Sequence, residues 1–158
     1  KGGSVAKSEL GYLLDAGNAE AFALQKLKQP IQESATFRLR YRAATRSATR
    51  NACFCFGAAP ENDKLFKAGT MIGMDRHGAF DGSWANVNLG AGKKLKIDRD
   101  ATFEALVTID LEHGKVILKI DGARIEHQLP SSLQSVAYVG IYAKATKSEF
   151  SKLERVAK

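Results

Sequence analysis

The stretch that decides the fold is Ala35-Thr36-Phe37-Arg38-Leu39-Arg40-Tyr41-Arg42, in which apolar and polar side chains alternate without a break. Successive side chains of a β-strand point to opposite faces of the sheet. This period of two therefore places Phe37, Leu39 and Tyr41 on one face and the three arginines on the other. A helix would scatter the same apolar side chains around its axis. The stretch predicts a half-buried β-strand.

A three-stranded antiparallel meander is predicted further along the chain. Phe103–Leu111 again places alternate apolar side chains on one face, and after a turn that contains Gly114 the chain returns as the apolar stretch Val116–Ile120. Glycine supplies the positive φ that a tight hairpin requires. Asp121-Gly122 forms the next turn, and Ala123–Leu129 is the third strand.

Other apolar segments predict further strands. Asn51–Phe56 is almost entirely apolar, which is typical of a central strand buried on both faces. The remaining expected strands, the last of which directs Phe150 and Leu153 inward, are Ala21–Leu27, Lys67–Met74, Asn86–Leu89, Leu95–Ile97, Val136–Tyr142 and Ser148–Val156. No segment keeps a period of 3.6 over three turns, although Ser131–Ser135 leaves room for one helical turn. We therefore predict an all-β chain, a sandwich of two antiparallel sheets formed by one domain over residues 1–158.

The composition is that of an ordinary soluble globular chain. The 158 residues are 44% hydrophobic and 26% charged, which is enough for a substantial core. No apolar run approaches the roughly 18 residues that cross a bilayer, so no membrane partner is expected. The net charge of +7 comes from basic residues spread along the sequence. Because they are not concentrated with aromatic residues, nucleic acid is not an expected partner.

The two cysteines, Cys53 and Cys55, are expected to be structural. In a strand they share one face at a separation of roughly 6.5 to 7 Å, which is too far for an unstrained disulfide. We interpret them as small buried apolar side chains. A metal-binding pair is the alternative, but no Cys or His cluster supplies two further ligands.

Several motifs together resemble a known superfamily. They are Phe103–Ile109, the turn at His113-Gly114, Val116–Ile120 followed by Asp121-Gly122, Val139–Tyr142, and Glu149–Leu153. In this combination the sequence resembles the concanavalin A-like lectin/glucanase superfamily, and within it the laminin-G-like and 3-keto-disaccharide hydrolase-type jelly rolls. The resemblance implies a jelly-roll sandwich. That fold hosts lectins, carbohydrate-binding modules, adhesion domains and glycosidases, so it does not by itself imply an activity.

No catalytic or metal-binding constellation stands out. Glucanases of the superfamily place alternating acids along one strand, and Glu104, Asp110 and Glu112 do not match that pattern. We expect these acids to belong to a solvated outer face. The histidines His77, His113 and His127 are scattered, so no metal site and no cofactor is predicted. Calcium is left open, because some lectins bind it, but no motif here indicates it.

A polar loop with the only tryptophan is the first candidate for a binding site. Sugar rings stack on tryptophan, and planar polar side chains form hydrogen bonds with sugar hydroxyls. The composition of this loop, which contains Trp84, is therefore typical of a glycan contact. The predicted ligand-binding residues of this loop are Asp75, His77, Asp81, Trp84 and Asn86. Alternatively, Trp84 and Phe80 only close the loop against the edge of the sandwich.

The arginines of the first strand are the second candidate. Arg38 and Arg40 would line a polar sheet face able to hold an anionic or hydroxylated ligand. Alternatively, they form an exposed face whose charges discourage pairing with other chains.

We therefore predict a non-catalytic, lectin-like module whose partner is carbohydrate. One alternative is a glycoside hydrolase of the 3-keto-disaccharide type. Another is a laminin-G-like adhesion module for a protein or a sulfated glycan. The chain starts at Lys1 without Met or an apolar signal core, so we interpret it as a piece of a larger extracellular or periplasmic protein. Neither the glycan nor the oligomeric state is predicted.

Overall fold

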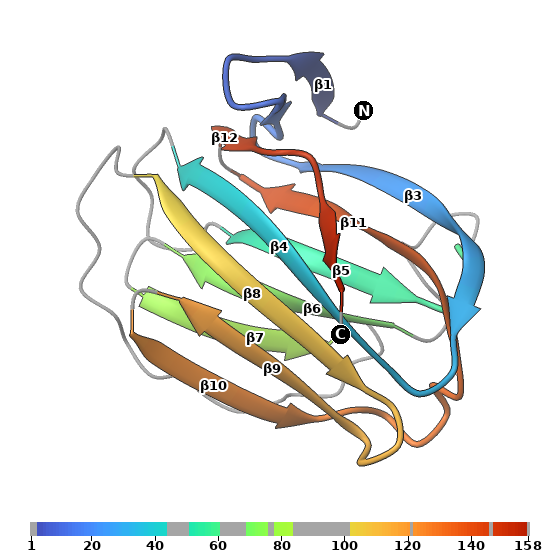
Figure 1. Cartoon of the computed structure of the whole chain (residues 1–158). Coiled ribbons are helices and arrows are strands. Elements are labelled where there is room, and N and C mark those ends of the chain that lie inside the picture. Colours follow the sequence, from blue (N-terminus) through green and yellow to red (C-terminus); the bar gives the residue numbers. More distant parts are fainter. Residues whose placement is uncertain are drawn as a thin grey trace.

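The predicted sandwich of two antiparallel sheets is confirmed by a computed structural model, which describes residues 3–43, 51–60, 69–75, 78–83, 102–120, 122–145 and 147–157. Over these ranges the chain forms 13 strands and no helix, and so no helix that could span a membrane. Figure 1 shows the two sheets stacked face to face.

The eight-stranded sheet has the order β1-β2-β12-β4-β8-β9-β10, and β13 pairs with β4 beyond the end of β12. Its strands are β1 Ser4–Lys7, β2 Tyr12–Asp15, β4 Ser34–Ala43, β8 Phe103–Asp110, β9 Lys115–Ile120, β10 Ala123–Gln128, β12 Lys147–Phe150 and β13 Glu154–Val156. The five-stranded sheet has the order β3-β11-β5-β6-β7. Its strands are β3 Glu20–Ile31, β5 Asn51–Gly57, β6 Gly69–Asp75, β7 Gly78–Ser83 and β11 Val136–Lys144.

Strand β4 has the two faces that its alternation predicts. Phe37, Leu39 and Tyr41 are buried in the core between the sheets, whereas Arg38 and Arg40 are exposed. Phe37 contacts Phe54 of the opposite sheet, with ring centroids 5.4 Å apart. Each large apolar side chain buried in this way stabilises the fold by roughly 1.5 to 3 kcal/mol.

The predicted meander is also confirmed. Strand β8 pairs with β9, and β9 pairs with β10, both in antiparallel register. Gly114 and Gly122 in the two turns have φ angles of +60° and +73°. Only glycine adopts this left-handed region without strain, which explains both turns.

Strand β5 is buried on both faces, as its apolar sequence predicts. Phe54 and Phe56 belong to the main core between the sheets. Cys53 and Cys55 lie on the opposite face and pack with Tyr142 of β11 in a second apolar cluster. Both cysteines are reduced and buried, and burial raises the pKa of the Cys55 thiol. The cysteines are therefore structural side chains, as expected.

The prediction of one closing strand over Ser148–Val156 is wrong. The chain forms β12, leaves the ladder at residues 151–153, and resumes as β13. Phe150 pairs with Tyr41, and Glu154 pairs with Arg38, so three residues of this segment lie opposite two residues of β4. This extra residue is a β-bulge, which alternation alone does not reveal. Phe150 is buried and Leu153 packs partly against the core.

Other boundaries differ at the ends of the sheets. Strands β1, β2 and β7 were not predicted. Gly78–Ser83 was interpreted as part of a polar loop, because glycines and polar residues are typical of loops, but it forms β7. Strand β3 continues past Leu27 through Pro30. Proline is tolerated there because β3 lies at the edge of its sheet and its pairing with β11 is irregular near that end. No helical turn forms at Ser131–Ser135: Ser131 and Ser132 make a turn, and the Leu133 N–H donates to the Pro130 carbonyl at 2.9 Å. The strands expected at Asn86–Leu89 and Leu95–Ile97 lie outside the described residues.

Candidate functional site

A pocket of about 230 Å³ lies on the outer face of the eight-stranded sheet, and we call it the arginine pocket. Strand β4, the turn between β1 and β2, and the bulge after β12 form it. Its lining residues are Leu10, Gly11, Arg38, Arg40, Ser151, Lys152 and Glu154. Both arginines predicted as ligand-binding residues are therefore brought to one pocket.

The bulge is held against β4 by Ser151. The Ser151 N–H donates to the Arg40 carbonyl at 2.8 Å, and the Arg40 N–H donates to Ser151 Oγ, also at 2.8 Å. The Ser151 hydroxyl donates in turn to the Lys152 carbonyl at 2.9 Å. The serine side chain thus replaces a main-chain acceptor of the ladder. This arrangement fixes the backbone of Arg40 while Lys152 projects from an irregular segment.

The turn between β1 and β2 can contact the bulge because residue 11 is glycine. Gly11 has a φ of +148°, and an added Cβ atom would lie 2.8 Å from the Phe150 carbonyl oxygen. Ser8 closes the turn, since its N–H donates to the Gly11 carbonyl at 3.1 Å. A larger residue at position 11 would push the turn away from the bulge and open one wall of the pocket.

The three arginines of β4 differ in their acidic partners. Arg38 Nε lies 3.7 Å from Glu104 Oε1. Arg42 forms an ion pair with Glu149. Arg40 forms no side-chain ion pair or hydrogen bond within the described part of the chain. Its guanidinium therefore keeps its donors available at the pocket.

Two of the loop candidates, Asp75 and Asp81, lie in strands of the other sheet. Asp75 is at the end of β6, in register with Asn51 and Gly78, and Asp81 is in β7, in register with Ile72. These two strands are neighbours at one edge of the five-stranded sheet. His77, Trp84 and Asn86 lie outside the described residues, and for Asp75 and Asp81 only the strand positions are described.

Of the described candidates, the arginines and the aspartates belong to different sheets. Arg38 and Arg40 are exposed on the face of the eight-stranded sheet that points away from the core, while the strands of Asp75 and Asp81 belong to the five-stranded sheet. The predicted roles of these residues in binding stay predictions.

The outer face of the five-stranded sheet carries an apolar surface that the sequence analysis did not single out. Phe22 of β3 is 46% exposed and lies in register with the buried Tyr142 of β11. Burial, followed by the nearby Glu20 carboxylate, raises the pKa of Tyr142. Leu24, Met71 and Tyr138 pack at the same face. Phe22 was predicted only as a strand residue, because Ala21–Leu27 has apolar side chains on both faces and its pattern does not show which face is buried.

The hairpin between β8 and β9 brings together three polar side chains. Each of Asp110, Glu112 and His113 has one atom of a kind that ligates metal ions, and these three atoms lie within 4.8 Å of one another. The Asp110 carboxylate accepts a hydrogen bond from the His113 N–H at 3.1 Å and lies 3.0 Å from His113 Nδ1. Partial burial opposes ionisation of Asp110, but these contacts with His113 prevail and lower its pKa. His113 therefore has a partner that its position in the sequence did not indicate, and the contact closes the turn.

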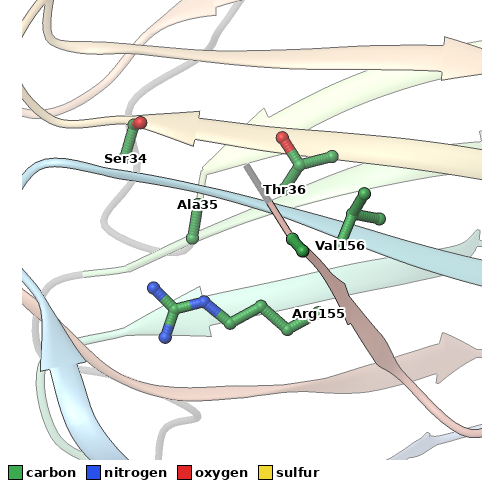
Figure 2. Close-up of a pocket in the computed structure, with 6 residues that line it drawn as sticks. Ser34, Ala35, Thr36, Arg155 and Val156 are labelled. Carbon is green, nitrogen blue, oxygen red and sulfur yellow. The ribbon is translucent and has the colours of Figure 1, made fainter.

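A second pocket, of about 380 Å³, lies where β13 ends beside the start of β4. Figure 2 shows Ala35 and Arg155 on one side of β4, and Ser34 and Thr36 on the other. Its lining has one charged side chain, Arg155. No residue of this pocket was predicted as a ligand contact.

Comparisons with known proteins agree on the fold. No family model matches the sequence, and no curated protein matches it. The carbohydrate-binding module CBM66 from Bacillus subtilis is 13% identical, with a TM-score of 0.67 over 98% of this chain and 92% of that one. Lectin I-B4 from Griffonia simplicifolia is 12% identical, with a TM-score of 0.65 over 99% and 92%. The carbohydrate recognition domain of Emp47p is 12% identical, with a TM-score of 0.61 over 98% and 86%.

At these identities the likeness concerns the fold. The chain has the jelly-roll sandwich of lectins and carbohydrate-binding modules. This architecture is consistent with the concanavalin A-like superfamily that the sequence resembles.

Proposed function

We propose that this chain is a non-catalytic, lectin-like module that binds carbohydrate and belongs to a larger protein outside the cytoplasm, extracellular or periplasmic. The observation that carries the proposal is the fold, whose likeness to carbohydrate-binding modules and lectins extends over nearly the whole chain. A sandwich of this kind is a scaffold that holds loops and sheet faces in place as binding surfaces.

The proposed sugar contact is the region at β6 and β7. Trp84 follows directly after β7 and would stack on a sugar ring, while Asp75, His77, Asp81 and Asn86 would form hydrogen bonds with hydroxyl groups. Asp75 and Asp81 lie in neighbouring strands at one edge of the five-stranded sheet, three register positions apart.

Titration calorimetry against a panel of neutral and acidic oligosaccharides tests the proposal. Replacing Trp84 by Ala should weaken binding by about two- to tenfold, since stacking on an aromatic ring contributes roughly 0.5 to 1.5 kcal/mol. Tyr12→Ala is the matched control, because Tyr12 is an exposed aromatic residue of the eight-stranded sheet. Absence of binding to every sugar, or equal binding by wild type and Trp84→Ala, would refute the proposed site.

The same panel distinguishes the two other functions that the resemblance implies. Turnover of a glycoside or a 3-keto-disaccharide, lost on changing Asp75 or Asp81, would replace the binding role by a hydrolase role. A laminin-G-like adhesion role is favoured by the arginine pocket, which is suited to acidic ligands. Retention on a heparin column at moderate salt, without binding to any oligosaccharide of the panel, neutral or acidic, would support adhesion instead.

A further inference from the structure

We propose that the arginine pocket binds one oxyanionic group, a carboxylate or a sulfate, of an acidic polysaccharide. The inference rests on the proposed carbohydrate-binding function and specifies the ligand class. It also assigns the recognition of charge to the eight-stranded sheet, apart from the sugar contact proposed at β6 and β7.

The contrast among the three arginines of β4 is the first support. Arg38 and Arg42 each have an acidic partner, Glu104 and Glu149. Arg40 lies between them on the same face and has no such partner among the described residues. A guanidinium presents parallel N–H donors that match the two oxygens of a carboxylate or sulfate. An anion from outside the chain would supply Arg40 with an acidic partner of the kind that Arg38 and Arg42 have within the chain.

The charges around the pocket are the second support. Its lining contains three basic side chains, Arg38, Arg40 and Lys152, and one acidic side chain, Glu154. Glu104 of β8, which contacts Arg38 and lies in register with Arg40, offsets part of this positive charge from outside the lining. The remaining excess of positive charge suits a group with one negative charge better than a neutral sugar.

The position of Arg40 is the third support. Both backbone groups of Arg40 are paired with Ser151, and its strand is paired with β8 on the other side. The guanidinium therefore extends from a fixed backbone, which lowers the entropy lost when it binds an anion. Leu10 and Gly11 form an uncharged wall against which the sugar ring that carries the anion would lie.

The pocket also indicates the size of the ligand group. A volume of about 230 Å³ accommodates one sugar residue with its acidic substituent. The phosphate backbone of a nucleic acid would require a row of unpaired cations along several phosphates. In the row on β4, two of the three arginines are already paired with acids.

Calorimetry with matched glycans tests the inference. We would titrate the protein with a polyuronate oligosaccharide, a sulfated neutral oligosaccharide, the unsulfated form of the latter, and duplex DNA. Arg40→Gln should weaken binding to the acidic glycans by about tenfold or more, because a charge-assisted pair is lost. Binding of the unsulfated glycan should not change. Preference for the polyuronate or for the sulfated glycan identifies the anion as a carboxylate or a sulfate.

Arg124→Gln is the matched control. Arg124 is an exposed arginine of β10 in the same sheet, paired with Glu126, so its loss changes the net charge by the same amount outside the pocket. Equal losses for Arg40→Gln and Arg124→Gln would overturn the inference, because the effect would then come from net charge alone. Lys152 lies in the bulge and also lines the pocket. If Arg40→Gln does not fold, Lys152→Gln takes its place in the test, and it too should weaken binding of the acidic glycans.

The remaining outcomes are distinct. If neutral glycans bind and an acidic group does not increase the affinity, the inference is overturned but the proposed carbohydrate-binding function stands. Absence of binding to every glycan overturns both. Binding of duplex DNA as tight as that of the acidic glycans, with the same dependence on Arg40, replaces the polysaccharide by a nucleic acid.

Discussion

The outer faces of the two sheets differ more than the alternating sequences of their strands indicate. On the eight-stranded sheet, Arg38 and Arg40 of β4 are exposed and charged. On the five-stranded sheet, Cys53 and Cys55 of β5 are only 1% and 0% exposed, although they too point away from the main core. Facing away from the core therefore does not mean facing solvent. The first surface is suited to recognising charge, and the second is stabilised by apolar packing.

The largest expected effect comes from placing an acid on each outer face. Cys55→Asp should lower the free energy of unfolding by more than about 4 kcal/mol at pH 7, because a charge would be buried without a partner. Arg40→Asp should change it by less than about 1 kcal/mol, since position 40 is exposed. Urea unfolding measures both values. Similar losses at the two positions would show that the two outer faces are not different environments.

A medium effect is expected at the turn that forms one wall of the arginine pocket. Gly11→Ala should cost roughly 1 to 3 kcal/mol, because the backbone conformation is strained for alanine and the new Cβ atom would meet the Phe150 carbonyl. Gly17→Ala is the control, since Gly17 also has a positive φ but an added Cβ atom there would have no neighbour within 4 Å. Thermal unfolding of the two variants should give a larger loss for Gly11→Ala. A loss no larger than that of Gly17→Ala would argue against close packing of the turn on the bulge.

The smallest effect concerns the polar contact of the β8–β9 hairpin. The pKa of Asp110 is lower in the folded chain, so its ionised form stabilises the fold at neutral pH, and this contribution disappears as the pH falls through the lowered pKa. Asp110→Asn should therefore lower stability by less than about 1 kcal/mol at pH 7 and by progressively less under acidic conditions. Urea unfolding at a series of pH values measures the difference between wild type and variant. A difference that grows as the pH falls would contradict the assignment.

The sequence by itself determined the strands whose pattern is local. The faces of β4, the burial of β5 on both sides, and the glycine turns of the β8–β9–β10 meander follow from side chains that alternate along one stretch of chain. Since a strand repeats every two residues, the buried face can be read without knowing what covers it. The residue types of the candidate sites were also visible in the sequence, as an arginine row and a polar loop with one tryptophan.

Only the tertiary structure decided how the strands pair and which candidate site residues come together. The bulge at Ser151 and its hydrogen bonds to Arg40 join positions separated by 111 residues, so no local pattern indicates the arginine pocket. The strand orders likewise place Arg40 and Asp81 in different sheets. The physical reason is that a β-sheet is held by hydrogen bonds between distant segments, whose register depends on partners that alternation within one strand does not specify.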